Sequence, residues 1–340
     1  MAHIAIVGAG LIGRLTALQL TGLNHHVTLF DKESAQGQTS AAYTAAGLLT
    51  PYGESLGTEK LVVDMGVSAL RKWPVLLSKL DHHVDFSFTG SICVSHQQDI
   101  GDYRRFHQHI KQYYPQSQLS TLNKAQLSTL EPELVDKFNG GIFVPNEGVI
   151  NNHQLLAALT HQLSNHALVT WHENVEVAEV KSHQVTITSG QSHAFDLVID
   201  SRGTGSPISG LRAVRGEVIY LHAPAVNIAR PIRLMHPRYK LYIAPKHGQH
   251  YAIGATEIES SDYRPITVQS SLELLSAIYS VHKGFAEAHI TQQFANCRPA
   301  FNDNLPRVVS QKGLIQINGL YRHGFLLAPE VVDIAVSEIQ

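Results

Sequence analysis

Apolar and polar residues follow one another along the chain in blocks that predict strands and helices in turn. Near the start, a β-branched run over 4–7 precedes an amphipathic segment containing Leu15 and Leu18, and a second apolar run follows over 27–30. Short buried runs separated by helical periodicity are typical of a β–α–β unit. We therefore predict such a unit over residues 3–31.

The remaining pattern mixes helices and β-rich stretches rather than repeating this unit. A helix is expected near 59–80, where Pro74 should kink or break it because proline removes a backbone donor. Residues 84–95 alternate as a pair of strands would, and polar helices are expected near 98–114 and 124–131. Further helices are predicted at 152–165, 267–284 and from about 329, and further strands at 175–180, 184–188, 196–200, 217–221, 241–244, 251–254, 294–299 and 314–317.

Glycine-rich turns interrupt the pattern at two places that lie far apart in the sequence. The first occupies Gly8–Gly13, and the second, Gly203–Gly205, follows a predicted strand. One such turn at each end of an inserted segment indicates that one domain is discontinuous and that a β-rich domain is threaded through it. We predict a two-domain α/β protein (α+β) with a Rossmann-like cofactor domain at 1–83, 140–212 and 298–340, and the β-rich domain at 84–139 and 213–297.

The first turn has the form G-x-G-x-x-G, with a strand before it, a helix after it and Asp31 at the end of the next strand. Gly8 permits the tight turn, Gly10 lets the backbone approach a pyrophosphate, and Gly13 lets the helix pack closely on the strand. Unpaired N–H groups and the helix dipole favour an anion at the start of that helix. The turn predicts a dinucleotide, of a kind left open here, held by Gly8, Ala9, Gly10, Leu11, Ile12, Gly13, Asp31 and Lys32.

Composition narrows the classes of partner. Of 340 residues, 44% are hydrophobic and 16% charged, and the formal net charge is −2 without a basic tract. Nucleic acid and anionic membranes are therefore not expected partners. No uncharged apolar run reaches about 18 residues, so no membrane span is expected. Residues 4–20 lack a positively charged lead-in and contain Arg14, which favours a strand and helix over a signal peptide.

Cysteine and histidine give little sign of disulfide or metal chemistry. Cys93 and Cys297 are the two cysteines, and without a C-x-x-C motif they fit a reduced, cytoplasmic setting. The 21 histidines show neither H-E-x-x-H nor an acid at ligand spacing. We therefore expect solvated surface histidines and no metal site.

Five segments, in order along the whole chain, resemble the D-amino-acid-oxidase-type FAD enzymes, and within them the glycine oxidases of thiamine biosynthesis. They are residues 8–13, 39–54, 251–257 (YAIGATE), 297–299 (CRP) and 319–329 (GLYRHGFLLAP). The resemblance implies FAD rather than NAD, because the last segment has no role in an NAD-dependent dehydrogenase. It also implies a fold of the glutathione-reductase or D-amino-acid-oxidase type, in which an antiparallel β-rich substrate domain is inserted into the FAD-binding domain.

The resemblance further implies which residues surround FAD. Asp31 stands where many flavin enzymes have glutamate, and either carboxylate can accept from ribose hydroxyls. A helix beginning just after 322–327 would direct its N–H groups at the flavin edge that gathers negative charge on reduction. Beyond the first turn, the implied contacts are Thr39, Ser40, Ala46, Gly47, Leu48, Val175, Val177, Gly203, Gly205, His323, Gly324, Phe325 and Leu326.

Three residues match the substrate site of the glycine oxidases. A carboxylate is best held by a guanidinium, whose planar fork binds both oxygens, and Arg298 stands where that family keeps such an arginine. Tyr242 matches a tyrosine whose hydroxyl also reaches the carboxylate, and Arg322 matches a second arginine near the flavin. The alternatives are structural, since an arginine before proline is more often a salt-bridge residue and a strand tyrosine is usually packed. Cys297 matches only loosely the cysteine that binds flavin in the sarcosine oxidases, so we expect non-covalent FAD.

These residues imply an FAD-dependent oxidase for glycine or another small amino acid. The products would be an imine, then a 2-oxo acid and ammonia, with dioxygen reduced to hydrogen peroxide, and the imine could feed thiazole synthesis for thiamine. One alternative is a dehydrogenase for a D-amino acid or an N-methyl amino acid, with an acceptor other than oxygen. Another is a flavin-binding partner protein without oxidase activity. The substrate (glycine, sarcosine, D-alanine or D-proline) and a homo-oligomeric state stay open.

Overall fold

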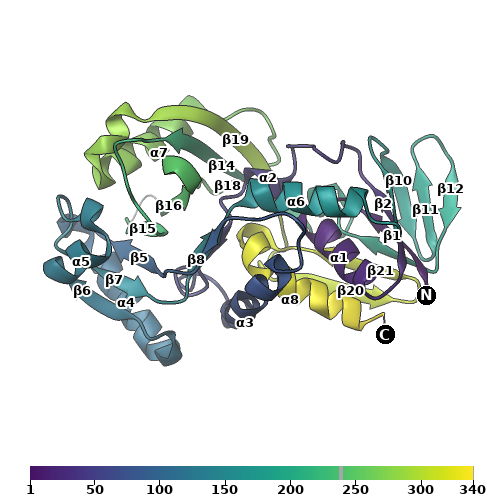
Figure 1. The fold of residues 1–340 in the computed structure, drawn as a ribbon, viewed down its shortest axis with the longest axis horizontal. Helices are drawn as coiled ribbons and strands as arrows, with labels where there is room; N and C mark the ends of the chain where they lie inside the picture. Colours follow the sequence, from purple (N-terminus) through teal and green to yellow (C-terminus); the bar gives the residue numbers. More distant parts are fainter. Residues whose placement is uncertain (237–239, 340) are drawn as a thin grey trace.

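The chain folds into two lobes, and both termini lie in one of them (Figure 1). The computed structural model describes residues 1–236 and 240–339. The lobe with the termini is built on a six-stranded sheet whose neighbours are parallel, except for an antiparallel strand at one edge. In spatial order its strands are β20 (Arg307–Gln311), β21 (Leu314–Asn318), β13 (Leu197–Asp200), β1 (His3–Val7), β2 (His26–Phe30) and β9 (Val169–His172).

Helices cover one face of this sheet and a small antiparallel sheet covers the other. Because side chains alternate along a strand, Ile4 and Ile6 face the helices, whereas Ala5 and Val7 face the small sheet. All four are buried, as expected for parallel strands covered on both sides. The helices on the sheet are α1 (Leu11–Gly22), α6 (Asn152–Ser164) and α8 (Gly324–Ser337), and α3 (Lys60–Leu77) packs on α8. The small sheet is β10 (Val177–Lys181), β11 (Gln184–Ile187) and β12 (Ser192–Ala194).

The second lobe is built on a nine-stranded sheet in which β5 and β15 form the one parallel pair between described strands. One face packs on α5 (Lys124–Leu130) and α7 (Val268–Val281), and the other faces the first lobe. In spatial order the strands are β18 (Ile258–Glu259), β14 (Arg212–His222), β17 (His250–Gly254), β16 (Lys240–Lys246), β15 (Ile232–Met235), β5 (Ser91–Val94), β7 (Gly140–Val144) and β6 (Ser120–Asn123), with β19 (His289–Ala300) on β14.

Smaller elements join the lobes. A three-stranded sheet consists of β3 (Leu48–Leu49), β8 (Gly148–Ile150) and β4 (Phe86–Ser87), and α2 (Ala41–Thr44) packs against β19. Helix α4 (Ile100–Tyr113) packs on β5 and β7.

Most predicted elements are confirmed, but the pairing within 84–95 and the start of the last helix were predicted wrongly. The strands predicted within 84–95 do not pair with each other, because β4 pairs with β8 while β5 pairs with β7 and β15. Helix α3 runs through Pro74 without a break. Helix α8 begins at Gly324 rather than near 329, and Pro329 lies inside it. In addition, β7 pairs in the nine-stranded sheet, although the predicted boundary at 140 places it in the cofactor domain.

One side chain explains how Pro329 is tolerated inside α8. A proline at 329 cannot donate to the carbonyl oxygen of Phe325, one turn earlier in the helix. That oxygen instead accepts a hydrogen bond of 3.1 Å from the indole Nε1 of Trp73, the residue just before Pro74. Trp73 is fully buried between α3 and α8. The packing of the two helices therefore satisfies the group that Pro329 leaves unpaired.

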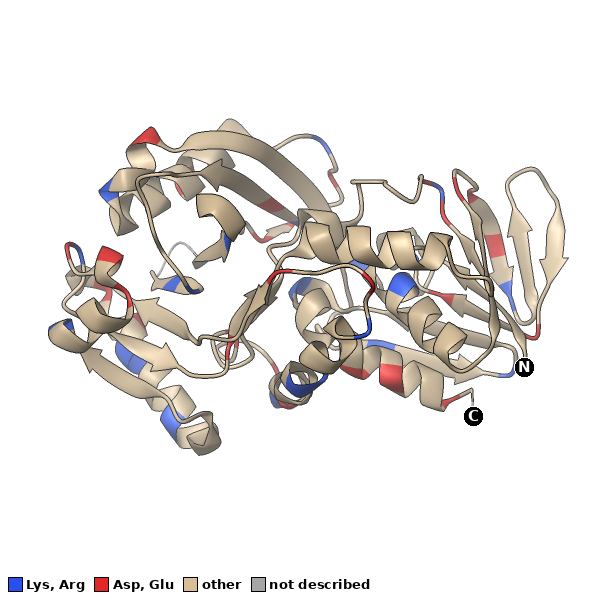
Figure 2. Ribbon diagram, viewed as in Figure 1, with Lys and Arg blue, Asp and Glu red and all other residues tan. Residues whose placement is uncertain are grey.

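Charged residues of both signs are interspersed over the two lobes in the view of Figure 2. Among the residues that the structure describes, no helix is both long and apolar enough to cross a membrane. Within 1–236 and 240–339, no group of three or more histidine, cysteine, aspartate or glutamate side chains is arranged to hold a metal ion.

Candidate active site

A cavity of about 480 Å³ lies where the two lobes meet, within the usual size of sites for small molecules and cofactors. Its wall combines the first glycine turn, the small-residue segment around 39–48, the start of α8 and the inner face of the nine-stranded sheet. The predicted site residues in its wall are Gly8, Ala9, Gly10, Leu11, Ile12, Asp31, Lys32, Thr39, Ser40, Ala46, Gly47, Leu48, Val175, Val177, Gly203, Gly205, Tyr242, Arg298, Arg322, His323, Gly324, Phe325 and Leu326.

Gly13 is the one predicted site residue outside this wall. A Cβ at Gly13 would overlap the carbonyl oxygen of Gly8 and lie 3.0 Å from the hydroxyl of Ser201, so the residue serves close packing of α1 on the turn. Gly8 has φ +95°, and its Cβ would lie 2.9 Å from the backbone of Arg202. A Cβ at Gly10, by contrast, would meet no atom within 4 Å, because this residue faces open space at the cavity.

The turn has the properties of a phosphate-binding site. Helix α1 begins without a side-chain cap at Gly10, so the N–H groups of its first turn remain available to an anion. The carboxylate of Asp31 accepts from the N–H of Ala9 at 2.5 Å and from the N–H of Glu33 at 3.0 Å. Beneath the turn, the buried Arg14 donates to the carbonyl oxygen of Ala9 at 2.7 Å, and burial lowers the pKa of Arg14 to about 10. The residues present therefore fit a dinucleotide.

Two of the implied FAD contacts, Val175 and Val177, have backbone groups that are already hydrogen-bonded within the protein. The N–H of Val175 donates to the carbonyl oxygen of Asp31 at 2.8 Å, and the carbonyl oxygen of Val177 accepts from Arg202 at 3.3 Å. The hydroxyl of Ser40 accepts from the N–H of Tyr43 and caps α2. These residues line the cavity while holding its edge together.

Two glycines on the inner face of the nine-stranded sheet leave space for the predicted carboxylate-binding side chains. A Cβ at Gly216 would lie 2.5 Å from Nη1 of Arg298, with other guanidinium atoms closer still. A Cβ at Gly254 would lie 2.5 Å from the hydroxyl oxygen of Tyr242, its neighbour on the adjacent strand. Burial raises the pKa of Tyr242 to about 12. Its hydroxyl therefore stays protonated and can donate to an anion.

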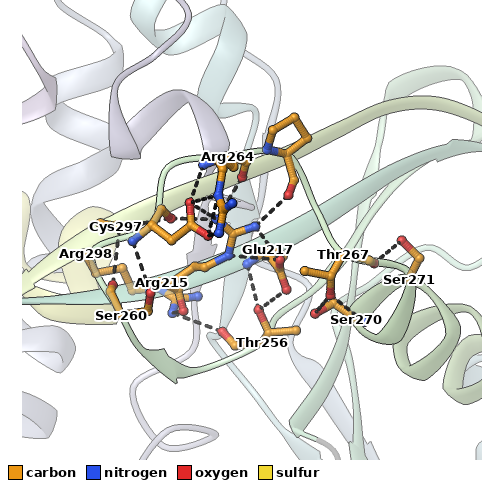
Figure 3. Close-up of polar contacts among 12 residues, drawn as sticks. Arg215, Glu217, Thr256, Ser260, Arg264, Thr267, Ser270, Ser271, Cys297 and Arg298 are labelled. Carbon is orange, nitrogen blue, oxygen red and sulfur yellow. Dashed lines mark hydrogen bonds and ion pairs between the residues drawn. The ribbon is translucent and has the colours of Figure 1, made fainter.

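Arg298 is held by backbone oxygens. Its Nη1 donates to the carbonyl of Thr256 at 3.1 Å and to that of Arg215 at 3.4 Å (Figure 3). These acceptors carry no full charge. These bonds leave the positive charge of the guanidinium and its other N–H groups to bind an anionic ligand in the cavity.

Arg322, by contrast, lies in a network of ion pairs. Its Nε lies 3.2 Å from Glu54, and its Nη1 lies 3.1 Å from Glu257. Glu54 also pairs with Arg233, which stands opposite Tyr242 on β15. Burial alone would raise the pKa of Glu54, but the two arginines hold it well below its usual range. Arg322 therefore neutralises the negative charges of Glu54 and Glu257 in the cavity wall.

Sequence reasoning missed Glu54 and Arg233, although one signal was present. The strand Ile232–Met235 reads I-R-L-M, and an arginine inside an apolar strand needs a buried partner or a site to serve. Sequence reasoning also missed Glu147, which is fully buried and accepts from the N–H groups of Tyr52 and Gly53 at 2.7 and 2.9 Å. Those bonds hold the turn that presents Glu54.

His323 and Cys297 are both buried beside the cavity. Burial lowers the pKa of His323 to about 3, so its imidazole is neutral near pH 7. The thiol of Cys297 donates to the carbonyls of Ser260 and Asp262 at 3.5 and 3.6 Å. Burial also raises the pKa of this thiol, which disfavours the nucleophilic thiolate.

A dinucleotide turn, an arginine and a tyrosine gathered in one cavity between two lobes define a two-domain enzyme that works with a nucleotide cofactor. The sequence pattern of the family described as DAO, FAD dependent oxidoreductase, matches residues 3–336, and the chain belongs to this family. The predicted cofactor class and family are thus confirmed.

Named relatives agree with this assignment. A ThiO protein of Rhizobium etli, named as a thiamine biosynthesis oxidoreductase, is 34% identical over 330 residues, which are 96% of this chain and 93% of the relative. The glycine oxidase of Geobacillus kaustophilus is 25% identical over 345 residues, covering 96% of this chain and 89% of that enzyme. Its crystal structure superimposes with a TM-score of 0.84 over 99% of this chain and 94% of that chain.

A crystal structure of glycine oxidase from Bacillus cereus gives a TM-score of 0.86 at 23% identity, over 100% of this chain and 97% of that chain. The predicted fold class is confirmed: the chain has the two-domain α/β fold of the glycine oxidases, with an FAD-binding domain and a β-rich substrate domain.

Proposed function

We propose that the protein oxidises glycine, or a similarly small amino acid, to its imine and then to a 2-oxo acid and ammonia, with release of hydrogen peroxide. The observation that carries this proposal is the pairing of Arg298 and Tyr242 over Gly216 and Gly254 in the cavity. A cationic fork and a neutral hydroxyl on one sheet face suit a carboxylate.

The residues of the cavity also suit FAD. When bound, FAD accepts two electrons from the amino acid and passes them to dioxygen. We assign its phosphates to Gly8–Ile12 and its ring to the wall formed by Ala46–Leu48 and His323–Leu326. The ion-paired Arg322 supports that wall at the start of α8. FAD binding is non-covalent in this proposal, because the buried thiol of Cys297 is engaged by two carbonyls. We also propose that the chain divides into the FAD-binding domain and the β-rich domain at the predicted boundaries, except that β7 belongs to the β-rich domain.

The side chains around the substrate position favour binding over proton transfer. An amino acid must lose its ammonium proton before oxidation. His323 and Glu54 are poor acceptors at neutral pH, because their pKa values lie far below 7. Neither side chain is therefore assigned as the base. We propose that the proton is released to water, so that turnover rises with pH toward the pKa of the substrate's ammonium group. Arg298 and Tyr242 meanwhile fix the carboxylate, and with it the direction in which Cα points.

The resemblance to the Rhizobium etli protein supports a role in thiamine biosynthesis, in which the glycine imine would feed thiazole formation. The shared family and the high coverage of both chains support this assignment. An oxidase and a dehydrogenase share this fold, so reduction of dioxygen is the property to measure.

An anaerobic titration of the purified holoprotein tests the proposal. Glycine, sarcosine, D-alanine and D-proline are added in turn while the visible flavin absorbance is followed. Bleaching by a small amino acid, with peroxide formed once air is admitted, supports the oxidase. Bleaching without peroxide points to the dehydrogenase. A bound flavin that none of the four reduces contradicts the proposal. The variant Arg298→Ala should retain FAD and lose turnover.

A further inference from the structure

A buried polar network lies next to Arg298, and Figure 3 draws its hydrogen bonds and ion pairs. Arg215 and Glu217 flank Gly216 on β14, so their side chains point away from the face that holds the guanidinium. They are 3% and 0% exposed and form an ion pair of 2.7 Å between Nη2 and Oε1. A charged pair this deep in a sheet is stable only when its remaining groups are also hydrogen-bonded.

Glu217 also forms side-chain hydrogen bonds to Ser270 and Thr256. Its backbone N–H donates to the hydroxyl oxygen of Thr256 at 2.9 Å, and that hydroxyl donates to Oε2 of Glu217 at 2.9 Å. Thr256 follows the end of β17 and lines the cavity. The two bonds fix the backbone whose carbonyl oxygen accepts from Arg298.

Arg215 completes its bonding with a turn that contains Tyr263. Its guanidinium donates to the carbonyls of Asp262, Arg264 and Pro265 at 2.6, 2.8 and 2.9 Å. The backbone carbonyl of Arg215 itself is the second acceptor for Arg298. Both oxygens that hold Arg298 therefore belong to residues whose side chains are fixed by the network.

We propose that Glu217, Thr256 and Arg215 are positioning residues that fix Arg298 for carboxylate binding. The inference rests on the proposed role of Arg298. The side chain of Arg298 is flexible, and its hydrogen bonds to two neutral carbonyls fix the position of the guanidinium. If Thr256 loses its bond to Glu217, its carbonyl shifts, and the fork no longer meets both carboxylate oxygens together.

The matched control is a second buried ion pair in the same lobe. Arg230 and Glu131 are 13% and 1% exposed and pair at 3.2 Å. Arg230 also donates to the carbonyls of Thr89 and Leu130, much as Arg215 does to its turn. Neither residue of this pair lines the cavity. Glu131→Gln therefore reports the cost of breaking a buried pair without touching Arg298.

The experiment compares Thr256→Val, Thr256→Ser, Glu217→Gln and Glu131→Gln as FAD holoproteins. Steady-state kinetics with glycine are measured beside the affinity for acetate, which is read from the change in the flavin spectrum. Thr256→Val and Glu217→Gln should each raise KM and the acetate Kd about tenfold, with a much smaller change in kcat, because a misaligned fork binds the carboxylate less well. Thr256→Ser, which restores the hydroxyl, should recover most of the affinity.

Glu131→Gln should lower thermal stability and leave the acetate Kd unchanged. Equal losses of affinity in Glu131→Gln and Glu217→Gln would overturn the inference, as would an unchanged Kd in Thr256→Val. If Glu217→Gln fails to fold, Thr256→Val still carries the test because it keeps the ion pair. Arg298→Ala separates the two proposals. If it binds acetate normally, the role of Arg298 itself is wrong. If it loses acetate while the network variants keep it, only the positioning role is wrong.

Discussion

Replacing Gly216 with alanine should disable Arg298 without disturbing the fold. The added Cβ would lie 2.5 Å from Nη1 of Arg298 and closer to other guanidinium atoms. The atoms that must yield are the far end of a flexible side chain, and the backbone of β14 can stay in place. The change therefore acts on the position of the guanidinium far more than on stability.

The size of the effect follows from the distance. Ordinary van der Waals contact begins at 3.4 Å, so the guanidinium must withdraw by about 1 Å, and a misplacement of about 1 Å costs roughly 100-fold in rate. We expect kcat/KM for glycine to fall about 100-fold, mainly through KM, since Arg298 holds the carboxylate. The melting temperature should change by no more than about 2 °C, which corresponds to about 1 kcal/mol in a chain of 340 residues.

Steady-state oxidase assays, FAD content and thermal unfolding of the variant measure these effects. Gly101→Ala is the matched control, because Gly101 lies in α4 and its Cβ would meet no atom within 4 Å. That variant should keep normal kinetics and at least the stability of the wild type, because alanine has the better helix propensity. A Gly216→Ala enzyme that holds FAD and keeps kcat/KM within about threefold of the wild type would refute the reasoning, because the predicted loss is about 100-fold.

Three further predictions concern the buried groups. Burial raises the pKa of Glu147 to about 7, so the contribution of its protonated form to stability is lost as pH rises from about 4.5 to 7. Burial lowers the pKa of Lys246 to about 7, so the contribution of its neutral form is lost as pH falls from about 10.5 to 7. Urea unfolding against pH should show the first slope vanish in Glu147→Gln and the second in Lys246→Met, and curves parallel to the wild type would contradict this. Trp73→Phe should cost about 1–3 kcal/mol, because the carbonyl of Phe325 loses its donor; an unchanged unfolding midpoint would count against that bond. Finally, acid precipitation should leave the flavin in solution for the wild type and for Cys297→Ala alike, and a yellow wild-type pellet would show covalent flavin.

Local signals in the sequence predicted much of this protein. The β–α–β unit at 3–31 and the phosphate turn follow from periodicity and from glycines at fixed offsets, which act within about 30 residues of one another. The predicted site residues, apart from Gly13, line one cavity. The errors arose where a distant partner changed a local rule. Pro329 lies inside α8 because Trp73, 252 residues from Phe325, donates to the freed carbonyl.

By itself, then, the sequence determined the class of cofactor domain and the residue types suited to FAD and a carboxylate. Tertiary structure decided what each charged side chain does. Arg298 faces the cavity with carbonyl partners only after β14 and β19 pair and Gly216 leaves room. Arg322 matches a substrate-site arginine in sequence but is balanced by Glu54 and Glu257. Pattern and propensity are local, whereas the partner of a buried charge is set by strand register between residues far apart in the chain.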